Sequence, residues 1–412
     1  MIDHLPLGLD QALALTLERL NPLPVQKVEL LDAVERVVAA DLFARVDAPS
    51  IDASLKDGYA VLSADVAAAS SDAPVRLRMM GTASAGGQER WQLRPGHTVQ
   101  VLTGARIPGQ ADAVLAEEYV RRDGDFILAC NHAEPGRNIQ LKGSDVMSGE
   151  RVAAAGRRLS PGQIGILAAA GHSRIPVYGS PRVAVIATGD EVVAPGHPLT
   201  EGKLYASNIV TLCAWCRRYG MPTRVAVVRD DPEAIRQALK SALSDCDAIL
   251  TSGGAWTGDR DLVARILQEL GWKEVFHRIR IGPGKAVGFG MLDGRAVFIL
   301  PGGPPSNLMG FLQIALPGLL RLAGETDPRL PVIRVRSACE LNGRYIDWTQ
   351  FVFGTIEEQP HDLPLFHPIQ KASRLHSVAE ATVVAAIPEG LTAIAAGQVL
   401  NAQLLVNRSL PC

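Results

Sequence analysis

The sequence of 412 residues lacks several features that would assign it to a class at once. It has little net charge, because 41 Lys and Arg residues balance 43 Asp and Glu residues, so the chain as a whole does not attract nucleic acid or an anionic membrane. It contains no run of about 18 apolar residues, which a membrane span requires. The first twenty residues lack the basic and apolar regions of a signal peptide. Six scattered cysteines are too few to staple a chain of this length, so they predict free thiols in a cytoplasmic protein.

The rest of the composition is that of a folded protein with more than one domain. Hydrophobic residues make up 47% of the chain and charged residues 20%, which excludes intrinsic disorder and allows several cores. At roughly 100–200 residues per domain, the length predicts two to four domains. The 39 glycines and 27 prolines show no collagen-like period, so they indicate many tight turns.

Residues 181–325 alternate between apolar strand patterns and amphipathic helix patterns. The strand patterns are RVAVIATG, TRVAVVRD, DAILTSGG and AVFILPGG, and each is followed by a helix pattern. Because such alternation is typical of a parallel sheet covered on both faces, this region predicts a three-layer α/β/α domain with a mostly parallel sheet. Residues 46–139 and 330–412 carry short alternating runs and turns, which predicts two β-rich units. A separate helix is predicted over residues 9–20, where leucines recur at helical spacing.

Four of the predicted strand ends carry loops suited to binding an anion. In an open parallel sheet, ligands bind at the carboxyl ends of the strands. Glycines let backbone N–H groups approach an anion, and acids supply the hard oxygen ligands that Mg²⁺ prefers. The hypothesis from these residues is a phosphorylated or anionic substrate held with a divalent cation. The loops are Thr188-Gly189-Asp190-Glu191, Arg229-Asp230-Asp231, Ser252-Gly253-Gly254 with Asp259 and Asp261, and Pro301-Gly302-Gly303-Pro304-Pro305-Ser306.

Some of these residues also have simpler interpretations. Asp231 precedes a proline at a helix start and is explained as a helix cap, and Ser252-Gly253-Gly254 as an ordinary turn. The sequence has neither a GxGxxG dinucleotide motif nor a GxxxxGK(S/T) phosphate loop, which disfavours NAD and ordinary ATPase chemistry. Cys213 and Cys216 have the CxxC spacing, but both fall on the core face of a predicted helix. We interpret them as buried structural cysteines rather than as a redox pair.

Two more motifs lie outside this sheet edge. Residues 56–60, KDGYA, are explained locally as an Asp-Gly turn. The segment Gly282-Pro283-Gly284-Lys285 places one lysine in a glycine-rich loop. Such a lysine is either an ordinary solvated side chain or a cation for a bound oxyanion.

Taken in order, these motifs resemble the molybdopterin molybdenumtransferase family, which includes the E domain of gephyrin. The resemblance implies a homodimer of elongated four-domain subunits. Domain I, helical and dimerising, would combine residues 1–45 and 140–180, with the β-rich domain II inserted at 46–139. Residues 181–326 would form the pterin-binding α/β domain III, and 327–412 the C-terminal β-barrel domain IV. The matching segments span nearly the whole chain: PSIDASLKDGYA, TGARIPGQADAVLAEE, GRNIQLKGSDVMSGERV, ATGDEVVAPGHPL, YASN, VRDDP, SGG with Asp261, PGK and LPGGPPS.

The resemblance also implies a reaction and its catalytic residues. Enzymes of this family take adenylylated molybdopterin, cleave off AMP with Mg²⁺ and insert molybdate, which yields molybdenum cofactor. By position, the implied catalytic residues are Asp57, Thr103, Glu191, Asp230 and Asp261, and the last three are the implied metal ligands. The resemblance implies that Asp57 meets the active site from the partner subunit and that Glu118 accompanies Thr103.

The implied substrate-binding residues lie in the glycine-rich loops and near the C-terminus. Three of them, Lys285, Ser306 and Ser373, are implied to hold the molybdate oxyanion. The family also implies an upstream adenylyltransferase and client molybdoenzymes as partners. The full set is Ser252, Gly253, Gly254, Gly302, Asn208, Lys285, Ser306 and Ser373.

The sequence departs from the family pattern near these positions. Gly282 stands where the family has a lysine, so one of two oxyanion-facing lysines is missing, and Arg280 and Arg374 are the candidates to replace its charge. The other departures are Ala286 for Pro, Trp256 for Ser, Gly303 for Asn, Ala53 for Asn and Lys56 for Met. They motivate a second hypothesis, a non-catalytic paralogue that binds pterin or finished cofactor and delivers it to a molybdoenzyme. A dimeric scaffold is the third.

Overall fold

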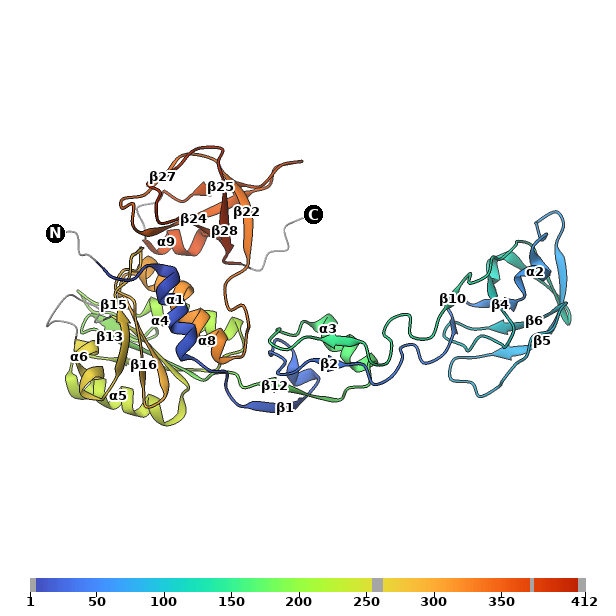
Figure 1. The fold of residues 1–412 in the computed structure, drawn as a ribbon, viewed down its shortest axis with the longest axis horizontal. Helices are drawn as coiled ribbons and strands as arrows, with labels where there is room; N and C mark the ends of the chain where they lie inside the picture. Colours follow the sequence, from blue (N-terminus) through green and yellow to red (C-terminus); the bar gives the residue numbers. More distant parts are fainter. Residues whose placement is uncertain (1–4, 254–261, 371–373, 407–412) are drawn as a thin grey trace.

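The computed structural model describes residues 5–253, 262–370 and 374–406. The molecule is elongated (Figure 1): α/β layers and a small barrel lie at one end, a β-rich unit lies at the other, and a narrow segment joins them. Within these residues, no helix has both the length and the apolar character needed to cross a membrane.

A six-stranded sheet forms the centre of the α/β part. Its neighbours β16, β13, β17 and β21 run parallel, whereas β20 is antiparallel to both β21 and β18. The carboxyl ends of the four parallel strands therefore meet at one edge, as the sequence predicts. In sheet order the strands are β16 (Thr223–Val228), β13 (Val183–Thr188), β17 (Ala248–Ser252), β21 (Arg295–Leu300), β20 (Gly288–Leu292) and β18 (Lys273–His277).

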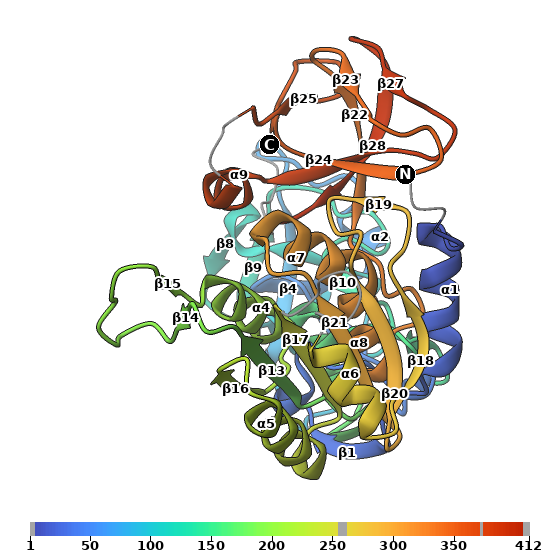
Figure 2. The same cartoon turned by 90° about the vertical axis from the view of Figure 1, so that its left-hand side faces the viewer.

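Helices cover both faces of this sheet (Figure 2), which confirms the three-layer prediction. Successive residues of a strand point to opposite faces. In β13, Val183 and Val185 accordingly join one core, and Ala184 and Ile186 join the other. The first face is covered by α4 (Ser207–Arg218), α7 (Pro304–Gly310), η4 (Phe311–Ala315) and α8 (Leu316–Leu322), and the second by α5 (Pro232–Asp245) and α6 (Leu262–Glu269).

Helix α1 (Leu9–Arg19) packs on the first face of the same sheet. Its residues Ala12 and Leu13 are buried there, and Leu20, just after the helix, is 2% exposed. The Leu20 carbonyl accepts a hydrogen bond from Arg321 at 3.3 Å. The helix predicted at 9–20 is confirmed, and it lies in the α/β core although residues 1–45 were expected to group with 140–180.

The narrow middle of the molecule combines two stretches that are far apart in the sequence. Strand β1 (Val25–Glu29) pairs antiparallel with β12 (Arg174–Tyr178), and β2 (Leu42–Phe43) pairs with β11 (Arg151–Ala153). A 3₁₀ turn, η1 (Leu31–Ala33), and helix α3 (Pro161–Ala169) complete this part. Ser160 caps α3 by accepting a hydrogen bond from the Gln163 backbone at 3.3 Å.

The inserted unit is built on a second six-stranded sheet, which confirms its β-rich character. A short pair, β3 (Ala53–Ser54) with β10 (Ile139–Gln140), joins it to the middle segment, and α2 (Ser63–Val66) and η2 (Glu117–Tyr119) connect strands. In sheet order the strands are β7 (Ala113–Ala116), β4 (Gly58–Val61), β6 (His97–Val101), β5 (Val75–Ala83), β9 (Phe126–Ala129) and β8 (Val120–Asp123).

The C-terminal strands close into a five-stranded barrel, as predicted. The barrel consists of β22 (Val332–Ser337), β24 (Thr349–Glu357), β25 (Leu365–Pro368), β26 (Val383–Ile387) and β28 (Val399–Leu404), and it closes because β24 pairs with both β25 and β26. Strand β19 (Ile281–Gly282) extends from the α/β part to pair with β24. The pair β23 (Leu341–Asn342) and β27 (Ala393–Ile394) and helix α9 (Arg374–Glu380) complete this part.

The CxxC cysteines lie on the buried face of α4. Cys213 is 9% exposed and Cys216 is fully buried. Burial raises the pKa of Cys216 to about 12, so its thiol stays protonated at neutral pH. The prediction of buried structural cysteines is confirmed.

Candidate active site

A cavity of about 510 Å³ lies at the carboxyl ends of β13, β17 and β21. Its volume falls in the range of pockets that bind small molecules. Four of the predicted substrate-binding residues, Asn208, Ser252, Gly253 and Gly302, line it together with the predicted catalytic residue Glu191. The structure therefore brings together residues from four separate segments of the sequence. Gly254 lies outside the described residues.

Two asparagine side chains connect the loops around this cavity. Asn208 Nδ2 donates to Ser252 Oγ at 3.3 Å and to the Gly302 carbonyl at 2.8 Å. Asn307 Nδ2 donates to Ser252 Oγ at 3.0 Å and to the Pro301 carbonyl at 2.9 Å. Since the Ser252 hydroxyl accepts both bonds, its own proton remains to be donated, and no acceptor in the described chain takes it.

Asn307 is a residue that sequence reasoning missed. It is 2% exposed, in the first turns of α7, directly after the glycine-rich loop. Both hydrogen bonds of its Nδ2 end on segments that line the cavities, so this buried side chain holds those segments together. The only available signal was a polar residue following LPGGPPS, at the start of an otherwise apolar helix.

Gly253 is required by the close approach of two strand ends. Its φ is +101°, and a Cβ there would lie 2.4 Å from the Thr188 carbonyl oxygen. Thr188 also lines the cavity, and its buried Oγ1 has no hydrogen-bond partner among the described residues. An orphaned buried hydroxyl at a cavity wall is a polar group available to a ligand.

The predicted acids Glu191 and Asp230 lie close enough to interact. Asp230 N donates to Asp190 Oδ1 at 3.4 Å. Burial raises the pKa of Asp230, and the charges of Asp190 and Glu191 raise it further. This repulsion is what a bound cation would relieve, and carboxylate oxygens are donors that Mg²⁺ accepts.

The described acids do not by themselves form a complete metal site. Among residues 5–253, 262–370 and 374–406, no three His, Cys, Asp or Glu side chains cluster as metal ligands. The third implied ligand, Asp261, lies outside these residues. The neighbouring Asp231 caps α5 by accepting a hydrogen bond from Ala234 N at 2.8 Å, which confirms its simpler interpretation.

A projecting loop covers one side of the cavity. The short parallel strands β14 (Val192–Val193) and β15 (Leu204–Tyr205) form its base (Figure 2). Leu199, Leu204 and Tyr205 line the cavity while being 45%, 51% and 41% exposed. Sequence reasoning identified the YASN motif but not this apolar wall, since exposed apolar residues in a loop give no periodic pattern.

A second cavity, of about 360 Å³, contains the predicted oxyanion residues Lys285 and Ser306. The loop from Pro301 to Ser306 separates it from the first cavity, because Gly302 and Pro304 line one and Pro301 and Ser306 line the other. Lys285 Nζ lies 5.8 Å from the centre of the Trp348 ring, which also lines the second cavity. Ser373 lies outside the described residues.

The two arginines considered as replacements for the missing lysine have different positions. Arg280 is engaged in the fold, since its guanidinium donates to the carbonyls of Leu5 and Asp347 at 2.9 Å. Arg374 lies beside Gly303, where a Cβ would be 3.8 Å from Arg374 Nη1. Trp256, which was expected to bear on the pterin site, lies outside the described residues.

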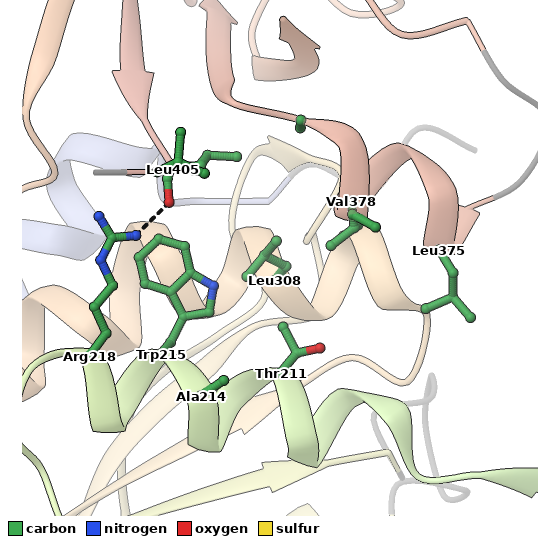
Figure 3. Close-up of a pocket in the computed structure, with 11 residues that line it drawn as sticks. Thr211, Ala214, Trp215, Arg218, Leu308, Leu375, Val378 and Leu405 are labelled. Atoms are coloured by element: carbon green, nitrogen blue, oxygen red, sulfur yellow. Dashed lines mark hydrogen bonds between the residues drawn. The ribbon is translucent and has the colours of Figure 1, made fainter. Parts of the chain in front are cut away.

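A third, apolar cavity of about 450 Å³ lies between α4 and α9 (Figure 3). Trp215 and Leu308 form its walls, and Leu375 lines both this cavity and the first one. Arg218 is at its rim and donates to the Leu405 carbonyl. None of the predicted site residues lines it.

Asp57, Thr103 and Glu118 lie in the inserted unit, at the far end of the molecule from the first cavity (Figure 1). Asp57 directly precedes β4, and its carbonyl accepts a hydrogen bond from Glu117 N at 3.1 Å. The structure thus groups these three residues with one another. It does not bring them to the other predicted site residues of the same chain.

Comparison with known proteins agrees with this architecture. Residues 7–171 match the family model described as MoeA N-terminal region (domain I and II), and residues 184–321 match the one described as probable molybdopterin binding domain. The molybdopterin molybdenumtransferase of Nostoc sp. is 31% identical, over 90% of this chain and 86% of its own length. That of Haemophilus influenzae is 33% identical, over 79% of this chain and 80% of its own.

Solved structures support the same relationship along the whole chain. A crystal structure of the molybdopterin biosynthesis moeA protein from Pyrococcus horikoshii is similar with a TM-score of 0.80 at 27% identity. It covers 97% of this chain and 99% of the other. Because relatives above 30% identity cover 79% and 90% of this chain and a solved structure covers 97% of it, this chain belongs to the molybdopterin molybdenumtransferase family.

Proposed function

We propose that this protein acts in molybdenum cofactor biosynthesis as a molybdopterin molybdenumtransferase, which inserts molybdate into adenylylated molybdopterin and releases AMP. The observation that carries the proposal is the pair of neighbouring cavities on either side of the loop from Pro301 to Ser306. One is bordered by glycine-rich strand ends and by Glu191, and the other contains a lysine and a serine hydroxyl. A phosphorylated pterin and an oxyanion require these two kinds of site.

The first cavity would bind the phosphorylated pterin. Ser252 retains a proton to donate, and Thr188 has a buried hydroxyl without a partner in the described chain. Gly253 and Gly302 also line this cavity, and because they have no side chain a ligand can approach their backbone closely. These neutral donors suit phosphate oxygens without requiring a charged side chain at each contact.

The acids beside this cavity would hold Mg²⁺, with Glu191, Asp230 and Asp261 as the ligands. The cation would neutralise phosphate charge while AMP departs. The raised pKa of Asp230 supports this role, because burial and then the charges of Asp190 and Glu191 disfavour its ionised form. A bound cation would relieve this cost.

The second cavity would bind molybdate through Lys285, Ser306 and Ser373. A lysine ammonium and serine hydroxyls are hydrogen-bond donors that match an oxyanion.

The alternative hypothesis, a cofactor carrier without turnover, gains no support from the described residues. Their side chains leave the first cavity open, and Lys285 and Ser306 both line the second cavity.

The proposal includes a homodimer in which Asp57 and Thr103 reach the site of the partner subunit. It also includes the four-domain division expected from the sequence, except that α1 belongs with the α/β part. Seven apolar side chains in and beside the middle segment support an interface, because each is at least 37% exposed. We expect an upstream adenylyltransferase and client molybdoenzymes as further partners, in the cytoplasm. The seven residues are Leu31, Val34, Phe43, Val46, Leu55, Leu141 and Met147.

The direct test uses the purified full-length protein with adenylylated molybdopterin, molybdate and Mg²⁺. AMP release and reconstitution of an apo-molybdoenzyme are the two measurements. We expect both to depend on molybdate and Mg²⁺. Absence of AMP release, under conditions in which another family member releases it, would refute the proposed activity.

A further inference from the structure

Arg278 lines the cavity that contains Lys285 and Ser306. The chain from 278 to 287 folds back on itself, since Arg278 N donates to the Val287 carbonyl at 2.9 Å and Ile279 N donates to the Lys285 carbonyl at 3.1 Å. This fold places the two basic residues across from each other on one loop, at one cavity.

Arg278 and Lys285 are the basic residues of this cavity, and none of the described residues that line it is an Asp or a Glu. In the described chain, no carboxylate or carbonyl accepts a hydrogen bond from the Arg278 guanidinium, although the side chain is half-buried. A guanidinium that no described acceptor engages, at the cavity of a second basic side chain, favours the binding of an anion.

The backbone of Arg278 adds a second, independent observation. Its φ is +74°, in the left-handed region that non-glycine residues rarely adopt. A glycine would adopt this conformation without strain, yet an arginine stands there. Strained residues of this kind cluster at active sites and ligand-binding sites.

We infer that Arg278 is the second cation of the oxyanion pocket and binds molybdate beside Lys285. The inference rests on the proposed function, since it deepens the role given there to Lys285 and Ser306. It also accounts for Gly282, because a guanidinium from the facing side of the loop supplies the charge that the family's additional lysine would supply. The planar fork of an arginine can donate two parallel hydrogen bonds to two oxygens of one oxyanion.

The test measures molybdate binding to the full-length protein by calorimetry, at constant ionic strength, together with the thermal midpoint. Arg278→Gly is the informative variant because glycine fits the observed φ, so the fold loses strain while the pocket loses a charge. We expect its molybdate affinity to fall about tenfold or more, with an unchanged or higher midpoint. Arg278→Lys should retain part of the affinity. Arg334→Ala, on the exposed face of barrel strand β22, is the control and should bind as the wild type does.

The outcomes separate this inference from the proposed function. Wild-type protein that binds no molybdate would remove the oxyanion role of the whole pocket, and with it the role of Arg278. Wild-type binding that Arg278→Gly retains in full would overturn the inference about Arg278 alone. As a second measurement, molybdate should protect Arg278 from modification by phenylglyoxal, as read by mass spectrometry, and unprotected modification would count against it.

Discussion

Thr103 donates two hydrogen bonds to a single carboxylate oxygen of Asp57, from its backbone nitrogen at 2.7 Å and from its hydroxyl at 2.8 Å. Both bonds lower the pKa of Asp57, with the backbone bond the larger cause. The carboxylate is therefore ionised and fixed in position, although it is exposed to solvent. A fixed, exposed charge remote from its own chain's cavities is suited to act on another subunit.

Replacing Thr103 with valine should raise the pKa of Asp57 toward its usual value of 3.8. A carboxyl with a lowered pKa contributes stability that is present above pH 3.8 and is lost as the pH falls through its folded-state pKa. The thermal midpoint of Thr103→Val should therefore fall below that of the wild type at neutral pH, and the two should converge in acid. Thr82→Val removes a hydroxyl that donates to Gln100 rather than to an acid, so it should show no such convergence. A constant difference at every pH would contradict the prediction.

The dimer proposal predicts complementation between two inactive chains. Asp57→Asn and Glu191→Gln should each abolish AMP release, because each removes one residue of every site. Co-expression should restore about a quarter of wild-type activity, since half of the randomly assembled dimers are mixed and each contains one intact site. Co-expression of Asp57→Asn with the Asp57→Asn, Glu191→Gln double variant is the control and should restore nothing. Mixed dimers that form without any recovery would show that Asp57 does not act across the interface.

Gly253 and Gly302 provide a matched pair at the cavity. Gly253→Ala should destabilise the fold by more than about 1 kcal/mol, because a Cβ would meet the Thr188 carbonyl and φ is positive. Gly302→Ala should have a much smaller effect, since its nearest contact would be the Cα of Gly253 at 3.8 Å. Denaturant midpoints measure the difference. Equal destabilisation of the two variants would mean that the close approach at Gly253 is not a constraint.

Asn307 should matter more for stability than Asn208. Asn307→Ala leaves the Pro301 carbonyl without its buried partner, so we expect a loss of about 1–3 kcal/mol in the free energy of unfolding. Asn208 is only half-buried, so Asn208→Ala should cost less stability and should mainly raise the KM for the pterin substrate. The reverse order in urea unfolding would refute this assignment.

Asp230 should make the stability depend on pH and on Mg²⁺. A carboxyl with a raised pKa contributes stability that is present below pH 3.8 and is lost as the pH rises through its folded-state pKa. Asp230→Asn should therefore have a higher thermal midpoint than the wild type at neutral pH, where the ionised carboxylate is repelled. Mg²⁺ should raise the midpoint of the wild type and not that of Asp230→Asn. The control is Asp231→Asn, which keeps a capping residue and should keep the response to Mg²⁺. A response retained in Asp230→Asn would exclude Asp230 as a ligand.

The sequence predicted the sheet edge well because three of its four parallel strands, β13, β17 and β21, are buried on both faces. Continuous apolar runs such as that of β13 predict a parallel sheet, and a parallel sheet places its loops together without further information. Asp231 was predictable for a similar reason, since a helix cap depends only on its neighbours in the chain.

Other features depended on contacts that no local pattern encodes. The apolar period of α1 predicts a buried face but not that this face packs in the α/β core. Asn307 and Arg278 were missed because the role of each depends on chain segments that approach only in three dimensions. Asp57 shows the same limit, because its local sequence predicts a turn and its relation to another subunit lies outside a single chain.

The packing of α1 against α8 has a consequence for how the chain is made. The segment that covers the apolar face of α1 is translated about 300 residues after the helix itself. At bacterial or eukaryotic elongation rates this delay is roughly 15 to 60 s. The leucines of α1 therefore stay uncovered while the middle segment, the inserted unit and the sheet strands are synthesised. We expect this helix to be a segment that chaperones bind during translation.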